Sequence, residues 1–187
     1  MRKLLILDKD GTLITTKSGK KFVQPPQDQK IIPGMGKALI AAKNSGWNIC
    51  VASNQLGIKL GYKTDSDSVA EFVYLHKLFP EIEVAVYCPD EGKTMTRINY
   101  KINNIATQNI FNWNVTVKKA GYQEELKEFR KPNPGMIQFL MTNFECQKNQ
   151  DKIVYVGDRP EDEQAALNAG VVFIWADVFN QDPLRFL

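Results

Sequence analysis

The chain has 187 residues, 43% of them hydrophobic and 24% charged, which fits one ordinary α/β domain or two very small ones and excludes a mainly disordered chain. Its apolar runs fall far short of the roughly 20 residues that a membrane span needs, and its N-terminus has no signal-peptide pattern, so we expect a cytoplasmic protein without a membrane partner. The net charge of +3 is too small to indicate a nucleic-acid partner by itself.

Short β-rich apolar runs alternate with helical patterns along the chain. The strands are predicted, in chain order, at Lys3–Asp8, Asn48–Ser53, Ile82–Cys88, Lys152–Gly157 and Val171–Trp175. The helices are predicted at Gly34–Asn44, at Ser66–Phe79 with Asp65 as its cap, at Asn133–Asn143, and at Glu161–Asn168 after Pro160. This alternation indicates an α/β fold with a doubly wound parallel sheet, which is a Rossmann-like, three-layer α/β/α arrangement. We expect residues 1–187 to form a single domain.

Two segments do not fit the alternation. The first, Thr12–Ile32, is polar and contains two consecutive prolines. The second, at about 89–129, is expected to be a long loop insertion with at most a short helix near Ile102–Ile110. It is too short for an independent cap domain, so we expect a domain without a large cap.

Polar residues follow three of the predicted strands directly. The first strand ends in Asp8-Lys9-Asp10-Gly11-Thr12, the second in Ser53-Asn54-Gln55, and the run at Lys152–Val156 in Gly157-Asp158 and the residues up to Asp162. Because open parallel sheets bind ligands outside the carboxyl ends of their strands, these clusters are expected to share one site. A single such aspartate is more often a turn or helix cap, but coincidence at three strand ends favours a site.

The residue types suggest chemistry on a phosphoryl group. Asp8 and Asp10 suit an attacking carboxylate and a proton carrier, and a hard cation such as Mg²⁺, held by them and by Asp158, would offset their repulsion. The chain has one histidine and three cysteines without a CxxC pair, so zinc is not expected. Fixed positive charge at Arg130 and Lys131 suits phosphate binding, together with the Ser53 hydroxyl and local backbone N–H groups.

Four strings, LDKDGTL, ASNQ, RKPNPGM and VGDRPEDEQAA, resemble in order and spacing the motifs of the haloacid dehalogenase superfamily of phosphatases along residues 5–166. The resemblance implies that Asp8 is the nucleophile that forms an aspartyl-phosphate and that Asp10 is the general acid and then the base. It further implies that Ser53, with Asn54 beside it, and Lys131, with Arg130 beside it, bind the phosphoryl group. Mg²⁺ would be held by Asp158, the Asp8 carboxylate and the Asp10 backbone carbonyl. The second acidic residue near the metal is Asp162 or the adjacent Glu161.

The motifs disagree about the substrate. The stretch TLITTKSGKKF at Thr12–Phe22 resembles the start of the phosphatase domain of polynucleotide kinase 3′-phosphatases, whereas RKPNPGM and VGDRPEDEQAA resemble histidinol-phosphate and heptose-bisphosphate phosphatases. Members of the second group commonly carry a zinc loop of Cys and His between the second and third motifs, and Pro89–Phe129 contains neither residue. The chain also lacks a GxxxxGK[ST] motif, so no kinase activity is expected of it.

The segment at about 89–129 intersperses basic and aromatic residues: Lys93, Arg97, Lys101, Lys118 and Lys119 with Tyr100, Phe111, Trp113 and Tyr122. They could contact single-stranded nucleic acid through phosphate attraction and base stacking, or the aromatics could pack the segment onto the domain. The leading expectation is therefore a Mg²⁺-dependent phosphomonoesterase acting on a polynucleotide 3′-phosphate at a single-stranded or nicked end. The alternatives are a phosphatase of a small metabolite, such as histidinol phosphate or a sugar bisphosphate, and a non-catalytic phosphate- or nucleic-acid-binding module.

Overall fold

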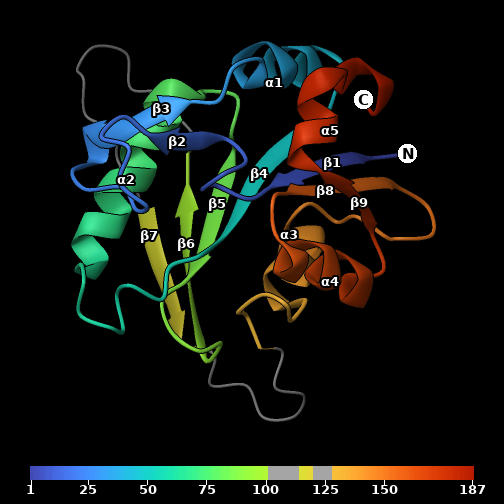
Figure 1. Cartoon of the computed structure of the whole chain (residues 1–187). Coiled ribbons are helices and arrows are strands. Elements are labelled where there is room, and N and C mark those ends of the chain that lie inside the picture. Colours follow the sequence, from blue (N-terminus) through green and yellow to red (C-terminus); the bar gives the residue numbers. More distant parts are fainter. Residues whose placement is uncertain (101–113, 120–127) are drawn as a thin grey trace, which may run out of the picture.

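The computed structural model describes residues 1–100, 114–119 and 128–187, and a seven-stranded sheet runs through all three ranges (Figure 1). Its strand order is β7-β6-β5-β4-β1-β8-β9. The parallel strands are β1 (Lys3–Leu7), β4 (Asn48–Asn54), β5 (Val84–Cys88), β8 (Lys152–Gly157) and β9 (Val172–Trp175). β1 lies at the centre between β4 and β8, so the chain winds outward from it in both directions.

Helices cover both faces of this sheet. α1 (Met35–Asn44), α2 (Asp65–Leu78) and α5 (Ala176–Gln181) pack on one face, and α3 (Gly135–Asn143) and α4 (Pro160–Ala169) pack on the other (Figure 1). Alternate residues of β1 serve the two faces: Leu5 and Leu7 join the first apolar cluster, and Leu4 and Ile6 the second. A strand buried on both faces reads as a continuous apolar run, and the predicted three-layer fold is confirmed.

The segment at about 89–129 is not simply a loop. It contains β6 (Thr94–Asn99) and β7 (Asn114–Lys119), which extend the sheet beyond β5 with antiparallel pairing. Only residues 89–93 connect β5 to β6, and a parallel crossover needs about a dozen residues or more, so the chain can only turn back on itself. The predicted parallel sheet is therefore extended at this edge by two antiparallel strands. The helix predicted near Ile102–Ile110 lies outside the described residues.

The polar segment Thr12–Ile32 forms a small second sheet over the first apolar cluster. β2 (Ile14–Thr16) pairs antiparallel with β3 (Gln29–Ile31), and the short 3-10 helix η1 (Pro26–Asp28) precedes β3. The buried side chain of Gln29 donates a 2.8 Å hydrogen bond to the backbone oxygen of Glu71, which fastens this small sheet to α2.

The N-terminus of α2 differs from the prediction by one residue. α2 begins at Asp65, but its cap is Thr64, whose hydroxyl accepts from the Asp67 N–H while the Asp67 carboxylate accepts from the Thr64 N–H. The predicted cap at Asp65 is therefore wrong by one residue.

A second 3-10 helix, η2 (Pro183–Arg185), follows α5 near the C-terminus. Within the described ranges, no helix combines the length and apolar character that crossing a membrane would require.

Candidate active site

The carboxyl ends of β1, β4 and β8 meet at one edge of the sheet, as the strand order requires (Figure 1). The register places Leu7 opposite both Val51 and Val156, so the residues after β1, β4 and β8 emerge at neighbouring positions. Asp8 follows β1, Ser53 lies near the end of β4, and Asp158 follows β8. The sequence-based expectation of a common edge is met by these three segments.

Lys131 is a buried cation in contact with two carboxylates of this site. Its ammonium group lies 2.5 Å from Asp8 Oδ1 and 2.6 Å from Asp162 Oδ1, and its side chain is only 3% exposed. It also donates hydrogen bonds of 3.1 Å to the Ala52 backbone oxygen and 2.9 Å to the Tyr155 hydroxyl. One fixed positive charge therefore lies between two buried carboxylates and reduces their mutual repulsion.

Asn54 holds the backbone of Lys131 in place. Its Oδ1 accepts a 3.1 Å hydrogen bond from the Lys131 N–H, and its Nδ2 donates a 3.1 Å bond to the Lys131 carbonyl oxygen. The peptide bond between Lys131 and Pro132 is cis. The Asn54 amide thus has a partner at each end on the segment that carries Lys131, and its contact with a phosphate stays a prediction.

Arg130 lies beside Lys131 in sequence, but its guanidinium group is not part of the same network. Its Nη1 is buried and has no hydrogen-bond partner among the described residues. Its role in phosphate binding stays a prediction.

Three carboxylates could share one metal ion. Oxygen atoms of Asp8, Asp158 and Asp162 all lie within 4.8 Å of one another, and Asp158 is exposed while the other two are buried. Gly11 leaves space for this cluster: its φ is +88°, and a Cβ atom there would lie 2.1 Å from Asp158 Oδ2. An all-oxygen set that is open on one side fits a hard divalent cation such as Mg²⁺.

Of the two candidate acidic residues after Asp158, the structure brings Asp162 to the cluster and leaves Glu161 exposed. Asp162 Oδ2 accepts hydrogen bonds from the N–H groups of Asp158 at 3.2 Å and Arg159 at 3.1 Å, at the start of α4. Its Oδ1 accepts a 3.0 Å bond from the Tyr155 hydroxyl. Both oxygens of Asp162 thus already accept hydrogen bonds that hold it beside Lys131 and the Asp158 backbone, and its coordination of a metal ion stays a prediction.

The Asp10 carboxylate forms hydrogen bonds with a different set of side chains from those around Asp8. Its Oδ1 accepts a 2.9 Å hydrogen bond from Lys9 Nζ, and its Oδ2 accepts a 3.2 Å bond from Gln55 Nε2. The same Gln55 Nε2 donates a 2.8 Å bond to the hydroxyl oxygen of Ser53. Because Ser53 accepts that bond, its own hydroxyl hydrogen is available to a phosphoryl oxygen.

Burial and nearby charges shift the pKa values of Asp8 and Asp10 in opposite directions. Burial, with added repulsion from Asp162 and Asp10, raises the pKa of Asp8 to about 7, although Lys131 opposes the shift. Burial would also raise the pKa of Asp10, but the nearby ammonium group of Lys9 and its hydrogen bond outweigh burial and hold that pKa below its ordinary value. A divalent cation on Asp8 would oppose this shift and favour the ionised carboxylate that a nucleophile needs.

Three residues of this site had no role assigned from the sequence. Lys9 and Gln55 adjoin predicted site residues, yet nothing in the local pattern shows that a lysine after a buried strand turns inward. Tyr155 occupies an ordinary apolar strand position, and its hydroxyl reaches Lys131 only through the tertiary fold. The one usable signal in the sequence was the position of Lys9 and Gln55: a polar side chain next to a predicted strand end is expected to have a hydrogen-bond partner if it is buried.

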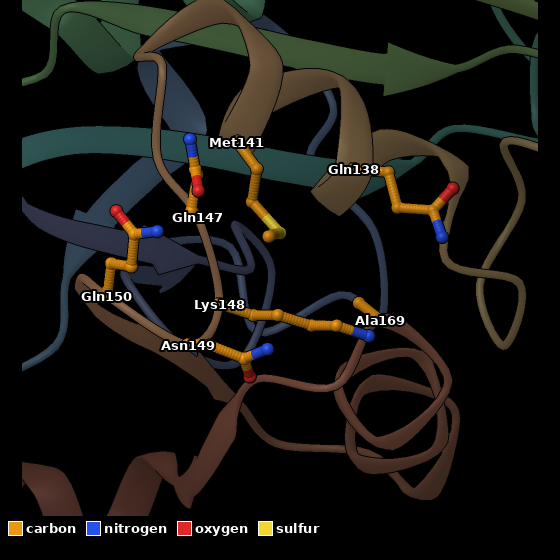
Figure 2. Close-up of a pocket in the computed structure, with 7 residues that line it drawn as sticks. All are labelled: Gln138, Met141, Gln147, Lys148, Asn149, Gln150 and Ala169. Carbon is orange, nitrogen blue, oxygen red and sulfur yellow. The ribbon is translucent and has the colours of Figure 1, made fainter.

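A cavity of about 380 Å³ lies elsewhere, between α3, the turn before β8 and the end of α4 (Figure 2). Its lining residues are Gln138, Met141, Gln147, Lys148, Asn149, Gln150 and Ala169. This is the amino-terminal side of β8, opposite the carboxylate cluster, and the lining contains no acidic residue or nucleophile. The cavity is therefore separate from the chemistry described above.

Two members of the basic and aromatic set pack into the domain. Tyr100 is buried, donates a 3.0 Å hydrogen bond to the Phe72 backbone oxygen and stacks on His76. The Arg97 guanidinium lies over the Phe139 ring of α3 and donates to Asn99. Lys93 is exposed, whereas Lys101, Phe111, Trp113, Tyr122 and the side chains of Lys118 and Lys119 lie outside the described part of the chain. For Tyr100 and Arg97, packing accounts for the residue.

Comparisons with known proteins find phosphatase relatives over most of the chain. A sequence model of the family described as polynucleotide kinase 3 phosphatase matches residues 3–173. A D-glycero-beta-D-manno-heptose-1,7-bisphosphate 7-phosphatase of Pseudomonas putida is 27% identical over 175 residues, which cover 90% of this chain and 78% of that protein. A D-glycero-D-manno-heptose-1,7-bisphosphate 7-phosphatase of Thermosynechococcus vestitus is 25% identical over 174 residues, covering 90% and 76%.

A solved structure shares the fold. The D,D-heptose 1.7-bisphosphate phosphatase from B. bronchiseptica, complexed with magnesium and phosphate, superposes with a TM-score of 0.63 at 22% identity. The match covers 91% of this chain and 78% of that one.

Proposed function

Since the chain belongs to the polynucleotide kinase 3 phosphatase family and is a phosphatase of the haloacid dehalogenase superfamily, we propose that it removes one phosphate from a sugar bisphosphate through an aspartyl-phosphate on Asp8. The single observation that supports this chemistry is the buried contact of Lys131 with Asp8 and Asp162 beside the open carboxylate of Asp158. It combines a nucleophile, a fixed cation and room for a divalent ion at one strand edge.

The relatives support the sugar bisphosphate alternative better than the leading expectation from the sequence. The named relatives act on heptose bisphosphates, and the packing of Tyr100 and Arg97 removes two residues from the proposed nucleic-acid surface. A polynucleotide 3′-phosphate is therefore the contrast substrate rather than the proposed one. The non-catalytic binding module is set aside, because the curated relatives are enzymes.

In the first step, an Asp8 carboxylate oxygen attacks phosphorus and the bond from phosphorus to the sugar oxygen breaks. Asp10 gives its proton to that departing oxygen. Although Lys9 favours the ionised form of Asp10, a phosphoryl dianion next to it would add negative charge and favour the protonated form. Lys131 and the Ser53 hydroxyl hold the phosphoryl oxygens in line with Asp8.

In the second step, Asp10 takes a proton from water, and the water oxygen attacks phosphorus. The bond between phosphorus and the Asp8 oxygen breaks, which releases inorganic phosphate and restores the carboxylate. Mg²⁺, held by the carboxylates of Asp8 and Asp158 and by the Asp10 backbone carbonyl, would supply positive charge to the phosphoryl oxygens. Asp162 and Arg130 would act beside these groups, Asp162 by fixing Lys131 and Arg130 as a further phosphate contact.

The test compares the release of inorganic phosphate from a heptose bisphosphate, histidinol phosphate and a 3′-phosphorylated oligonucleotide, each with Mg²⁺ and with EDTA. We expect Mg²⁺-dependent release in which kcat/KM for the bisphosphate exceeds that for the oligonucleotide at least about tenfold, a difference of roughly 1.4 kcal/mol in transition-state binding. A higher kcat/KM for the oligonucleotide would overturn the substrate proposal, and turnover that EDTA leaves unchanged would overturn the role of the metal.

A further inference from the structure

Five side chains next to the active site close a ring of hydrogen bonds. Lys9 Nζ donates to Asp10 Oδ1 at 2.9 Å and to Glu71 Oε2 at 3.1 Å. Lys63 Nζ donates to both oxygens of Glu71 at 2.9 and 3.0 Å, and to Gln55 Oε1 at 2.5 Å. Gln55 Nε2 donates to Asp10 Oδ2 at 3.2 Å, which completes the ring.

The ring joins three separate parts of the fold. Lys9 and Asp10 follow β1, Gln55 and Lys63 lie in the connection between β4 and α2, and Glu71 lies within α2. Lys9 is fully buried and Glu71 is 1% exposed, so neither charge is compensated by water. An unpaired charge at such a position would be strongly destabilising, and each is instead paired inside the ring.

The donors and acceptors allow only one arrangement of the ring. An ammonium group can only donate, so Lys63 fixes which end of the Gln55 amide faces it: Oε1 turns to Lys63, and Nε2 turns to Asp10. Lys63 is in turn held by both oxygens of Glu71. Glu71 therefore controls both contacts of the Asp10 carboxylate, one through Lys9 and one through Lys63 and Gln55.

We propose that Glu71 is a positioning residue that fixes the orientation of the Asp10 carboxylate for proton transfer to the departing oxygen. This inference rests on the role of Asp10 in the proposed function. Glu71 does not reach the carboxylate cluster itself, because its two oxygens are used by the lysines. Proton transfer is sensitive to placement, since an error of about 1 Å in a reacting group can reduce a rate about a hundredfold.

The test uses Glu71→Gln, which keeps the size of the side chain but leaves one acceptor oxygen and turns an NH₂ group toward an ammonium. The readout is kcat/KM on two substrates, glycerol phosphate and para-nitrophenyl phosphate. An alkoxide is a poor leaving group that needs a proton from Asp10, whereas para-nitrophenolate departs without one. We expect kcat/KM to fall at least about tenfold more on glycerol phosphate than on para-nitrophenyl phosphate.

A matched control is Glu83→Gln, which breaks another lysine–glutamate pair, with Lys43 at 2.8 Å, at the amino end of β5 and away from the site. We expect it to leave both substrates unaffected. If Glu71→Gln does not fold, Lys63→Met replaces it in the test. The Lys63 side chain is 20% exposed, so its loss should be tolerated, and without its ammonium group the Gln55 amide is no longer held. We expect the same preference for para-nitrophenyl phosphate there, smaller in size. Equal losses on both substrates in the folded variant would overturn the inference.

Asp10→Asn separates this inference from the proposed function. If Asp10→Asn loses activity selectively on glycerol phosphate and Glu71→Gln does not, only the role of Glu71 fails. If Asp10→Asn shows no such selectivity, the proposed role of Asp10 fails, whatever Glu71 does.

Discussion

Aspartates follow several strands at the same edge of this sheet, and those after β1 and β8 differ from the one after β5. Asp8 and Asp158 belong to a cluster of carboxylates beside Lys131, and Asp158 is exposed. Asp90, in the turn after β5, is used by its own turn: Oδ1 accepts from the N–H groups of Gly92, Lys93 and Thr94, and Oδ2 accepts from the Thr94 hydroxyl.

The pKa directions of the two regions show the same contrast. Burial and the neighbouring Asp162 raise the pKa of Asp158, as burial raises that of Asp8. Burial opposes the shift at Asp90, but the Thr94 hydroxyl and the backbone N–H groups outweigh it and hold its pKa below the ordinary value. An aspartate at a strand end is thus either a turn residue or a site residue, and its partners decide which.

The largest expected effect is that of Asp8→Asn. An amide cannot form the aspartyl-phosphate, so we expect phosphate release to fall by at least about 10⁴-fold while the fold is kept. Steady-state assays on para-nitrophenyl phosphate measure the loss, and circular dichroism checks the fold. Asp90→Asn is the matched control and should keep its turnover. A loss of less than about tenfold in Asp8→Asn would contradict the nucleophilic role that separates Asp8 from Asp90.

Lys131→Met should have the second-largest effect on activity. Without the ammonium group, Asp8 and Asp162 face each other in a buried site, and the phosphoryl oxygens lose a fixed charge. We expect kcat/KM to fall roughly a thousandfold and the free energy of unfolding to fall by about 3 kcal/mol, as when one partner of a buried pair is removed. Urea titration measures the second quantity. Unchanged stability would mean that Lys131 does not compensate the buried carboxylates.

Gly11→Ala should have a smaller and more selective effect. A Cβ atom at this position of positive φ would collide with Asp158 Oδ2, so the Asp158 carboxylate must move from its present place in the cluster. We expect the Mg²⁺ concentration for half-maximal activity to rise about tenfold or more, as when a group that orients a metal ligand is removed. Gly19→Ala is the matched control, because Gly19 also has positive φ but nothing within 4 Å of a Cβ atom. Equal Mg²⁺ dependence of the two variants would contradict the proposed metal site.

The smallest effect is expected for Asp90→Asn, and it should depend on pH. A carboxyl whose pKa is lowered by folding stabilises the protein above its unfolded pKa of about 3.9, and this stability is lost as the pH falls through the lower folded pKa. We expect the variant to be less stable than the unsubstituted protein at pH 7, and the difference to shrink below about pH 4. Urea titrations of both proteins across this range measure it. A difference that stays constant with pH would show that the Asp90 charge is not what holds the turn.

Local pattern was enough to predict the parallel strands and most helices, because their apolar periodicity is strong. It was not enough for β6 and β7, where the segment at about 89–129 carries weaker apolar patterns and pairs only because β5 offers an open edge. It also could not show which parts of the site a polar side chain bonds to. Asn54 follows β4 beside Ser53, yet its amide bonds to the backbone of Lys131, which lies 77 positions away.

By itself, the sequence determined that acidic residues follow buried strands, that one lysine follows an arginine before a proline, and that the motifs match a phosphatase superfamily. Only the tertiary structure decided which charges meet. Lys131 reaches Asp8 across 123 positions, and Lys9 reaches Glu71 across 62. The reason is that a buried charge needs a partner of opposite sign, and which partner is near depends on the order of strands and the placement of helices, which no local stretch of sequence contains.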